Sequence, residues 1–190
     1  MSDKPKFPAA TAMAVADSLV HFLRPFSDRI IVAGSLRRLK AYVGDVEILY
    51  IPKFEERKHP EDMFIMRFEN LVDEQIAELE KTGVLERRKN VNGSEMFGPK
   101  NKLMRHIATG IPVDLFATTA DAWFNYLTCR TGPADSNTRI CVAAQRKGWK
   151  WNPYGNGFTN NRTGETKVME SEEAVFKFVG LPYLPPEKRR

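Results

Sequence analysis

The chain is most constrained by residues 45–51, an apolar segment in which Asp45 and Glu47 are two residues apart. Its β-branched and aromatic content predicts a buried strand that ends at Pro52. Side chains two residues apart on a strand share a face, so Asp45 and Glu47 project together. The segment therefore predicts a sheet that carries two carboxylates side by side on one face.

Gly34-Ser35 follows an earlier apolar segment, residues 29–33, which also predicts a strand. A short helix can begin at Gly34-Ser35, and the free N–H groups of a helix N-terminus favour phosphate. Arg37 and Arg38 add positive charge nearby. Two neighbouring carboxylates repel each other unless a cation lies between them, and Mg²⁺ takes both carboxylate and phosphate oxygens. The two segments together predict a magnesium and phosphate site.

Asp114 is a single carboxylate within the apolar residues 111–117. Val113 and Leu115 share one face of this predicted strand, and Asp114 lies on the other. A charged group in a central strand costs free energy unless it is paired or bound to a metal. Two alternatives stay open for Asp114, namely an ion pair with an arginine and a place in the metal site.

The remainder of residues 1–118 alternates between helical and strand-like patterns. Helical spacing predicts helices over residues 8–24 and 60–81, the second beginning at Pro60-Glu61-Asp62. Short strands separated by turns are predicted at residues 84–87, 95–97, 103–108 and 111–117. This part of the chain holds a group of basic residues that form either a solvated face or a contact with a duplex backbone: Arg87, Arg88, Lys89, Lys100, Lys102 and Arg105.

Composition excludes few functions. The 190 residues are 42% hydrophobic and carry a formal net charge of +5, which favours an anionic partner such as nucleic acid. Cys129 and Cys141 form no zinc pattern, no apolar run is long enough to span a bilayer, and residues 1–7 lack the apolar core of a secretory signal. We expect a monomeric cytoplasmic protein with no membrane contact, from a bacterial, phage or viral context.

Residues 34–50 resemble the signature of nucleotidyltransferases of the DNA polymerase beta (family X) kind. That signature is Gly-Ser, a helix with paired arginines, and Gly-Asp-x-Asp/Glu on a strand. A third acid on a later strand completes the family's set, and Asp114 matches that place. The C-terminal part resembles the family's thumb subdomain, with Thr131-Gly132, Asn137 and Lys147-Gly148-Trp149 in the expected order. The resemblance covers almost all of residues 30–189.

The resemblance implies an α+β fold in a minimal palm-plus-thumb form, without lyase or helix-hairpin-helix domains. A nucleotidyltransferase palm, with a mixed sheet and helices packed on one face, would occupy residues 1–118. A small α/β thumb that binds nucleotide and DNA would occupy residues 119–190, with helices over residues 119–129 and 139–147.

The resemblance also implies a site and a reaction. Asp45, Glu47 and Asp114 would be the catalytic residues and the ligands of two Mg²⁺ ions, with Mn²⁺ as a substitute. A nucleoside triphosphate would be bound by Gly34, Ser35, Arg38, Gly44, Thr131, Gly132 and Asn137. Primer-template or gapped DNA would be bound by Lys100, Lys102, Arg105 and Arg139. The reaction would add nucleoside monophosphates to a 3′-hydroxyl under template direction, fill short gaps in DNA repair, and release pyrophosphate.

Two departures from the family pattern leave other functions open. Glu47 replaces the commoner Asp, and Cys129-Arg130 replaces the Tyr-Phe pair that lies against the nucleotide sugar in vertebrate relatives. One alternative is a nucleotidyltransferase that works without a template or acts on a small molecule, a protein or an RNA end. The other is a catalytically inactive module that keeps the fold and binds nucleic acid.

Overall fold

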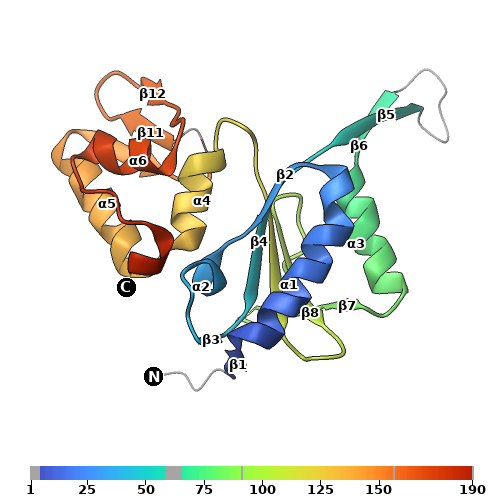
Figure 1. Cartoon of the computed structure of the whole chain (residues 1–190). Helices are drawn as coiled ribbons and strands as arrows, with labels where there is room; N and C mark the ends of the chain where they lie inside the picture. The colour runs from blue at the N-terminus through green and yellow to red at the C-terminus, as the bar shows by residue number, and fades with distance from the viewer. Residues whose placement is uncertain (1–4, 59–65, 91, 156, 190) are drawn as a thin grey trace.

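The computed structural model describes residues 5–58, 66–90, 92–155 and 157–189, which form two lobes (Figure 1). The first lobe is built on a five-stranded mixed sheet in which the second and third strands in spatial order run parallel and the remaining neighbouring pairs run antiparallel. In spatial order its strands are β2 (Ser27–Val32), β4 (Val46–Pro52), β9 (Pro112–Ala117), β8 (Asn101–His106) and β7 (Leu85–Arg87).

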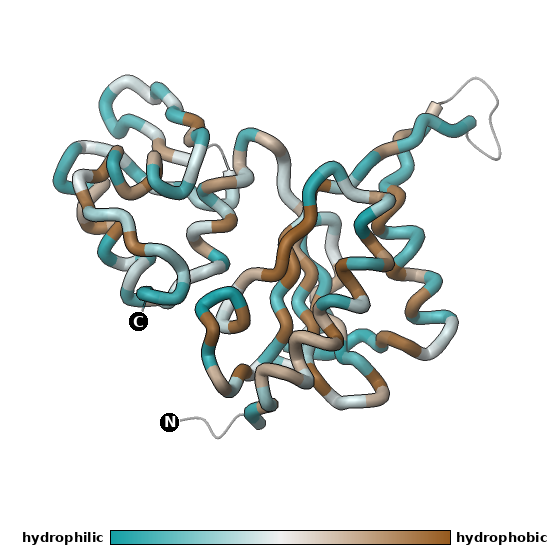
Figure 2. Tube along the Cα trace, viewed as in Figure 1, coloured by the Kyte–Doolittle hydropathy of each residue, from teal (hydrophilic) through white to brown (hydrophobic). Residues whose placement is uncertain are grey.

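Two helices cover one face of this sheet. They are α1 (Ala9–Leu23) and α3 (Leu71–Lys81), whose apolar residues recur at helical spacing. These residues pack with Val46, Ile48, Val113 and Leu115 of the two parallel strands in one core. Hydrophobic residues follow the central strands in Figure 2. The prediction of a helix over residues 8–24 is confirmed.

The opposite face of the sheet meets the second lobe. Leu49 and Phe116 pack there with residues of α4 (Trp123–Thr131) in a separate core. Glu47 and Asp114 alternate with the residues of the first core, so they lie on this face. Three short elements border it: α2 (Gly34–Arg37), β3 (Tyr42–Val43) and its partner β1 (Phe7–Pro8).

The predicted helix over residues 60–81 is wrong in its first part. A two-stranded ribbon, β5 (Phe54–Lys58) and β6 (Met66–Asn70), precedes α3 and projects from the lobe in Figure 1. The helix begins only at Leu71, because the Asn70 side chain accepts hydrogen bonds from the backbone N–H groups of Val72 and Asp73. Pro60-Glu61-Asp62 lies outside the described residues.

Other element boundaries also differ from the predictions. Residues 95–97 form only isolated bridges, Lys89 to Glu95 and Phe97 to Lys102, and no named strand. The helix predicted over residues 119–129 is α4, shifted toward the C-terminus. The helix predicted over residues 139–147 is α5 (Ala134–Arg146), which begins directly after Pro133. Proline is favoured at helix starts because its missing N–H has no partner there.

The second lobe has its own core. It comprises α4, α5, α6 (Glu172–Val179) and an antiparallel sheet of β10 (Trp149–Asn152), β11 (Gly157–Asn160) and β12 (Thr166–Lys167). Single 3₁₀ turns lie at Arg24–Phe26 and Pro186–Lys188. The α+β fold class is confirmed, while the domain boundary between residues 118 and 119 stays a prediction. Within the described ranges, no helix combines the length and apolar character that crossing a bilayer needs.

Candidate active site

The three predicted carboxylates come together on adjacent strands. Glu47 of β4 is the direct register partner of Asp114 of β9, and Asp45 lies two residues before Glu47. Directly opposed residues on paired strands share a face, so Glu47 and Asp114 both lie on the face that meets the second lobe. Asp45 immediately precedes β4, and its charge raises the pKa of both acids, so it lies close to them. The strand period that suggested the Asp45–Glu47 pair thus agrees with the observed register.

The surroundings of Glu47 and Asp114 disfavour their charged forms. Burial and the charges of Asp45 and Asp114 raise the pKa of Glu47 from its ordinary value of 4.5 to about 8, against the opposing charges of Arg130 and Arg38. Burial also raises the pKa of Asp114, although Arg88 opposes the shift. Mutual repulsion of this kind is relieved when a cation binds between the acids.

Arginines partly neutralise two of these acids. Arg88 follows β7, and its guanidinium donates a hydrogen bond to Asp114 Oδ1. Arg130 lies in the last turn of α4, with its Nη1 atom 3.8 Å from Glu47 Oε1. Of the two alternatives for Asp114, the structure shows the ion pair with an arginine.

The donor chemistry still fits a divalent metal. Within the described ranges, no group of three His, Cys, Asp or Glu side chains is arranged to hold a metal ion. Carboxylate oxygens are nevertheless the ligands that Mg²⁺ prefers, and cationic guanidinium groups already lie beside two of the three acids. Asp45, Glu47 and Asp114 would hold the metal once the two arginines release their partners.

Gly34 brings the phosphate segment close to Glu47. It opens α2 with a φ of +63°, and a Cβ atom at this position would lie 2.0 Å from Glu47 Oε2. Only glycine fits that backbone conformation and that close approach. Ser35 follows it in α2, while a Cβ on Gly44 would meet nothing within 4 Å. Gly34 is therefore next to Glu47, and Ser35 follows it directly in the chain.

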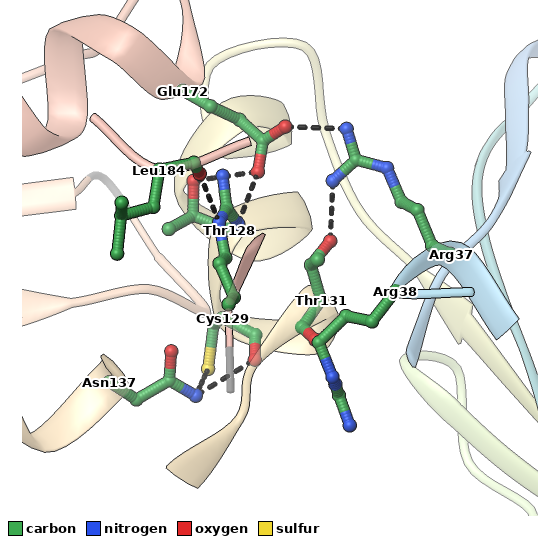
Figure 3. Close-up of polar contacts among 9 residues, drawn as sticks. Arg37, Arg38, Thr128, Cys129, Thr131, Asn137, Glu172 and Leu184 are labelled. Atoms are coloured by element: carbon green, nitrogen blue, oxygen red, sulfur yellow. Dashed lines mark hydrogen bonds and ion pairs between the residues drawn. The ribbon is translucent and has the colours of Figure 1, made fainter. Parts of the chain in front are cut away.

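The predicted nucleotide residues of the second lobe face α2. The Arg38 guanidinium donates a hydrogen bond to the backbone carbonyl of Thr131, and a Cβ on Gly132 would lie 3.2 Å from Arg38 Nη1 (Figure 3). Asn137 donates from Nδ2 to the backbone carbonyl of Cys129 at 2.8 Å. Its Oδ1 atom is buried and has no hydrogen-bond partner among the described residues. The site is thus formed by both lobes.

One cluster at the junction of the lobes was not predicted. Glu172 accepts hydrogen bonds from Arg37 at 2.5 Å, from Arg189 at 2.9 Å and from Thr128 at 3.3 Å (Figure 3). Arg37 also donates to Thr131 Oγ1 at 2.5 Å. The sequence showed Arg37 only as charge near a phosphate site, and no local pattern links it to Glu172, which is 135 residues away.

The predicted DNA-binding residues differ in their exposure and in their ion pairs. Lys100 and Arg139 are exposed, and Arg105 pairs with Glu86 at 2.7 Å. Lys102 is only 2% exposed and pairs with Asp73 at 2.7 Å, so it is not on the basic surface where the sequence had placed it. Alternation along β8 turns Lys102 and Arg105 to opposite faces.

A groove of about 600 Å³ lies next to the carboxylates. Asp45 and Gly44 line one part of it, and basic side chains line the other: Arg87, Arg88, Lys89 and Arg105. Positive charge along a groove attracts a phosphate backbone. The chain therefore has a basic groove that leads to its acidic site.

Two sequence comparisons match this chain, one over its C-terminal part and one over nearly its whole length. The sequence model of the DNA polymerase beta thumb family matches residues 126–190. The DNA polymerase/3′-5′ exonuclease PolX of Bacillus subtilis (strain 168) is 27% identical over 186 residues, which are 97% of this chain and 28% of that protein. The chain therefore spans little more than a quarter of this relative's length.

Two solved structures have the same fold. Both are of Leishmania infantum polymerase beta, one a ternary P/T complex and one a ternary gap complex, each with a TM-score of 0.74 and 19% identity. The first match covers 98% of this chain and 77% of the solved chain, and the second covers 97% and 71%. The chain therefore has the polymerase beta fold in two α+β lobes. More particularly, its residues 126–190 match the polymerase beta thumb family, and nearly the whole chain is similar in sequence to part of a PolX protein.

Proposed function

We propose that this chain is a metal-dependent nucleotidyltransferase that extends a DNA 3′-hydroxyl under template direction, fills short gaps in DNA repair and releases pyrophosphate. The observation that carries the proposal is the gathering of Asp45, Glu47 and Asp114 on one face, beside Gly34-Ser35. The similarity to family X polymerases supports the choice of DNA and nucleotide as substrates.

The acids would hold Mg²⁺ or Mn²⁺. Bound divalent cations supply charge neutralisation for the triphosphate and activation of the attacking hydroxyl. Asp114 would lie next to the attacking 3′-hydroxyl and would accept its proton, and burial raises the pKa of this carboxyl.

Residues of both lobes would bind the nucleotide. Ser35, Arg38 and the backbone of Gly34 and Gly44 would hold the phosphates, with Arg38 leaving the Thr131 carbonyl to do so. An amide nitrogen carries two hydrogens, so Asn137 can donate to a base edge while its other hydrogen stays on Cys129. Asn137 would donate to the minor-groove acceptors that all base pairs share.

The DNA would lie along the basic groove. Arg87, Lys89 and Arg105 are placed to contact phosphates, and exposed Lys100 and Arg139 extend the basic surface. Lys102 is left out of this set because it is buried against Asp73.

Primer extension tests the proposal. The wild type is compared with Asp114→Ala on gapped, recessed and single-stranded DNA, with each nucleotide and with Mg²⁺ or Mn²⁺. We expect templated extension, best on the gapped substrate, and a loss of at least about a thousandfold in Asp114→Ala. Asp121→Ala, which changes an exposed acid outside the site, serves as the matched control and should keep full activity.

Two other results would replace this function. Extension that ignores the template would favour the untemplated transferase. DNA binding without any extension would favour the inactive module, an alternative that gains some support from the arginine partners of Glu47 and Asp114. Full activity in Asp114→Ala would contradict the assignment of the site.

A further inference from the structure

Arg130 reaches from the second lobe to the metal site of the first. It belongs to the last turn of α4, and its Nη1 atom lies 3.8 Å from Glu47 Oε1. Its guanidinium carbon lies 3.6 Å from the ring centroid of Phe116 and 5.2 Å from that of Tyr154. Cation–π attraction to these rings holds the guanidinium close to Glu47.

The contact between Arg130 and Glu47 is weak for a buried ion pair. A separation of 3.8 Å is too long for a hydrogen bond. The Nε atom of Arg130 is buried and has no hydrogen-bond partner among the residues that the structure describes. Both side chains are largely buried, with 23% of Arg130 and 18% of Glu47 exposed. The aromatic rings therefore fix Arg130 more firmly than its carboxylate partner does.

We propose that Arg130 is a positioning residue that neutralises Glu47 while no metal is bound and must release it when a divalent cation binds. This inference rests on the proposed function. Guanidinium and metal compete for the same carboxylate, so the apparent metal affinity falls by the fraction of Glu47 that Arg130 occupies. The rings of Phe116 and Tyr154 give the released guanidinium a place to stay.

The competition also links the two lobes. Glu47 is on the sheet of the first lobe and Arg130 is on α4, directly before Thr131, one of the predicted nucleotide-binding residues. A metal that displaces Arg130 therefore changes a contact beside that predicted nucleotide site. Binding of metal and adjustment of α4 become parts of one equilibrium.

Direct metal binding tests this role without any measurement of activity. The signal of free Mn²⁺ in electron paramagnetic resonance gives its dissociation constant for the full chain without DNA or nucleotide. Arg130→Met removes the charge but keeps an apolar stem that can lie on the aromatic rings, so its dissociation constant should be about five- to tenfold lower than that of the wild type. Arg130→Gln, a second uncharged variant, should show the same change, which guards against a folding defect in either one.

Arg29→Met is the matched control. Arg29 also lies over aromatic rings, those of Trp123 and Phe124, each at 5.7 Å. Its substitution removes the same charge and should leave the dissociation constant for Mn²⁺ unchanged. Arg130→Lys keeps a charge at the site and should bind Mn²⁺ about as the wild type does.

The outcomes separate this inference from the proposed function. If Glu47→Gln loses Mn²⁺ binding while Arg130→Met binds it no more tightly than the wild type, the metal site stands and the role of Arg130 is overturned. If neither the wild type nor Arg130→Met binds Mn²⁺, both proposals are overturned. Only tighter Mn²⁺ binding by both Arg130→Met and Arg130→Gln supports competition between Arg130 and the metal.

Discussion

Glu47 and Glu172 are two buried glutamates that face arginines, yet their pKa values shift in opposite directions. The pKa of Glu47 rises to about 8 through burial and the nearby charges of Asp45 and Asp114. Burial also raises the pKa of Glu172, but the hydrogen bond and charge of Arg37 and the charge of Arg189 outweigh it and lower the pKa overall. Both side chains are largely buried, with 6% of Glu172 and 18% of Glu47 exposed, and burial raises the pKa of both.

The number and closeness of the partners explain it. Glu172 has two arginines within 2.5 and 2.9 Å and no other acid among the causes of its shift. Glu47 has one arginine at 3.8 Å and two neighbouring acids. Glu172, whose charge is balanced by two close arginines, links the two lobes. Glu47, with one more distant arginine and two neighbouring acids, is suited to bind a further cation.

Glu47→Gln should have the largest effect on activity and none on folding. Turnover should fall by at least about a thousandfold, because a neutral amide is a poor substitute for a carboxylate ligand in a metal-based charge clamp. The free energy of unfolding should stay equal or rise, since the substitution removes a repelled charge. Single-turnover extension and urea denaturation give the two quantities. Turnover within about tenfold of the wild type would remove Glu47 from the site.

Glu172→Gln should have the opposite profile. It leaves Arg189, whose side chain is 0% exposed, without its charged partner. The free energy of unfolding should fall by about 3 kcal/mol, as expected when one member of a buried ion pair is removed. Urea denaturation measures the loss. Glu173→Gln, the same change at the exposed neighbouring residue, should stay within about 0.5 kcal/mol of the wild type.

The pH dependence of stability should also separate the two glutamates. The unfolded chain ionises Glu47 at its ordinary value of 4.5, while the folded chain does so only near 8. The folded state binds more protons between these values, so the stabilising contribution of Glu47 is complete below 4.5 and is lost as the pH rises to 8. Relative to Glu47→Gln, the wild type should lose about 5 kcal/mol across this range in EDTA.

Glu172 should give the reverse slope. Its folded pKa is lowered, so its contribution is present above its unfolded pKa and is lost as the pH falls through the folded value. Urea denaturation of both variants and the wild type at several pH values provides the comparison. Equal slopes for Glu47 and Glu172 would show that their environments do not differ as described.

The site could be predicted from the sequence where short-range patterns determine it. The strand period places Asp45 and Glu47 on one face, and the resemblance to family X added Asp114 and the Thr131-Gly132 turn. Gly34 was part of the same local pattern, and its contact with Glu47 gives the glycine a physical reason. These features need only the spacing of residues within one element or one turn.

The other features of the fold and the site depend on tertiary contacts, which residue spacing within one element does not reveal. Arg37 and Glu172 are 135 residues apart, and neither was singled out as a partner of the other. Phe68 fell within the helix predicted over residues 60–81 but belongs to β6, and the Asn70 cap that begins α3 was not recognised. Lys102 looked like a surface lysine, but its strand turns it toward Asp73. In each case tertiary packing decided between alternatives that were locally equal.

The smallest expected effect concerns Arg38, the neighbour of Arg37. Arg37 belongs to the Glu172 cluster, whereas Arg38 contacts the Thr131 carbonyl and lies beside Gly132. Its proposed partner is a phosphate of the nucleotide, which is already present in the ground state. Arg38→Gln should therefore raise the KM for nucleotide by about tenfold and change kcat little. Steady-state extension at varied nucleotide concentration measures both constants.

Lys40→Gln removes an equal charge from an exposed position nearby and should leave KM unchanged. If Arg38→Gln instead weakened only DNA binding, Arg38 would belong to the DNA surface. The difference between Glu47 and Glu172 would then stand, but the site around Glu47 would lose its proposed nucleotide contact at Arg38.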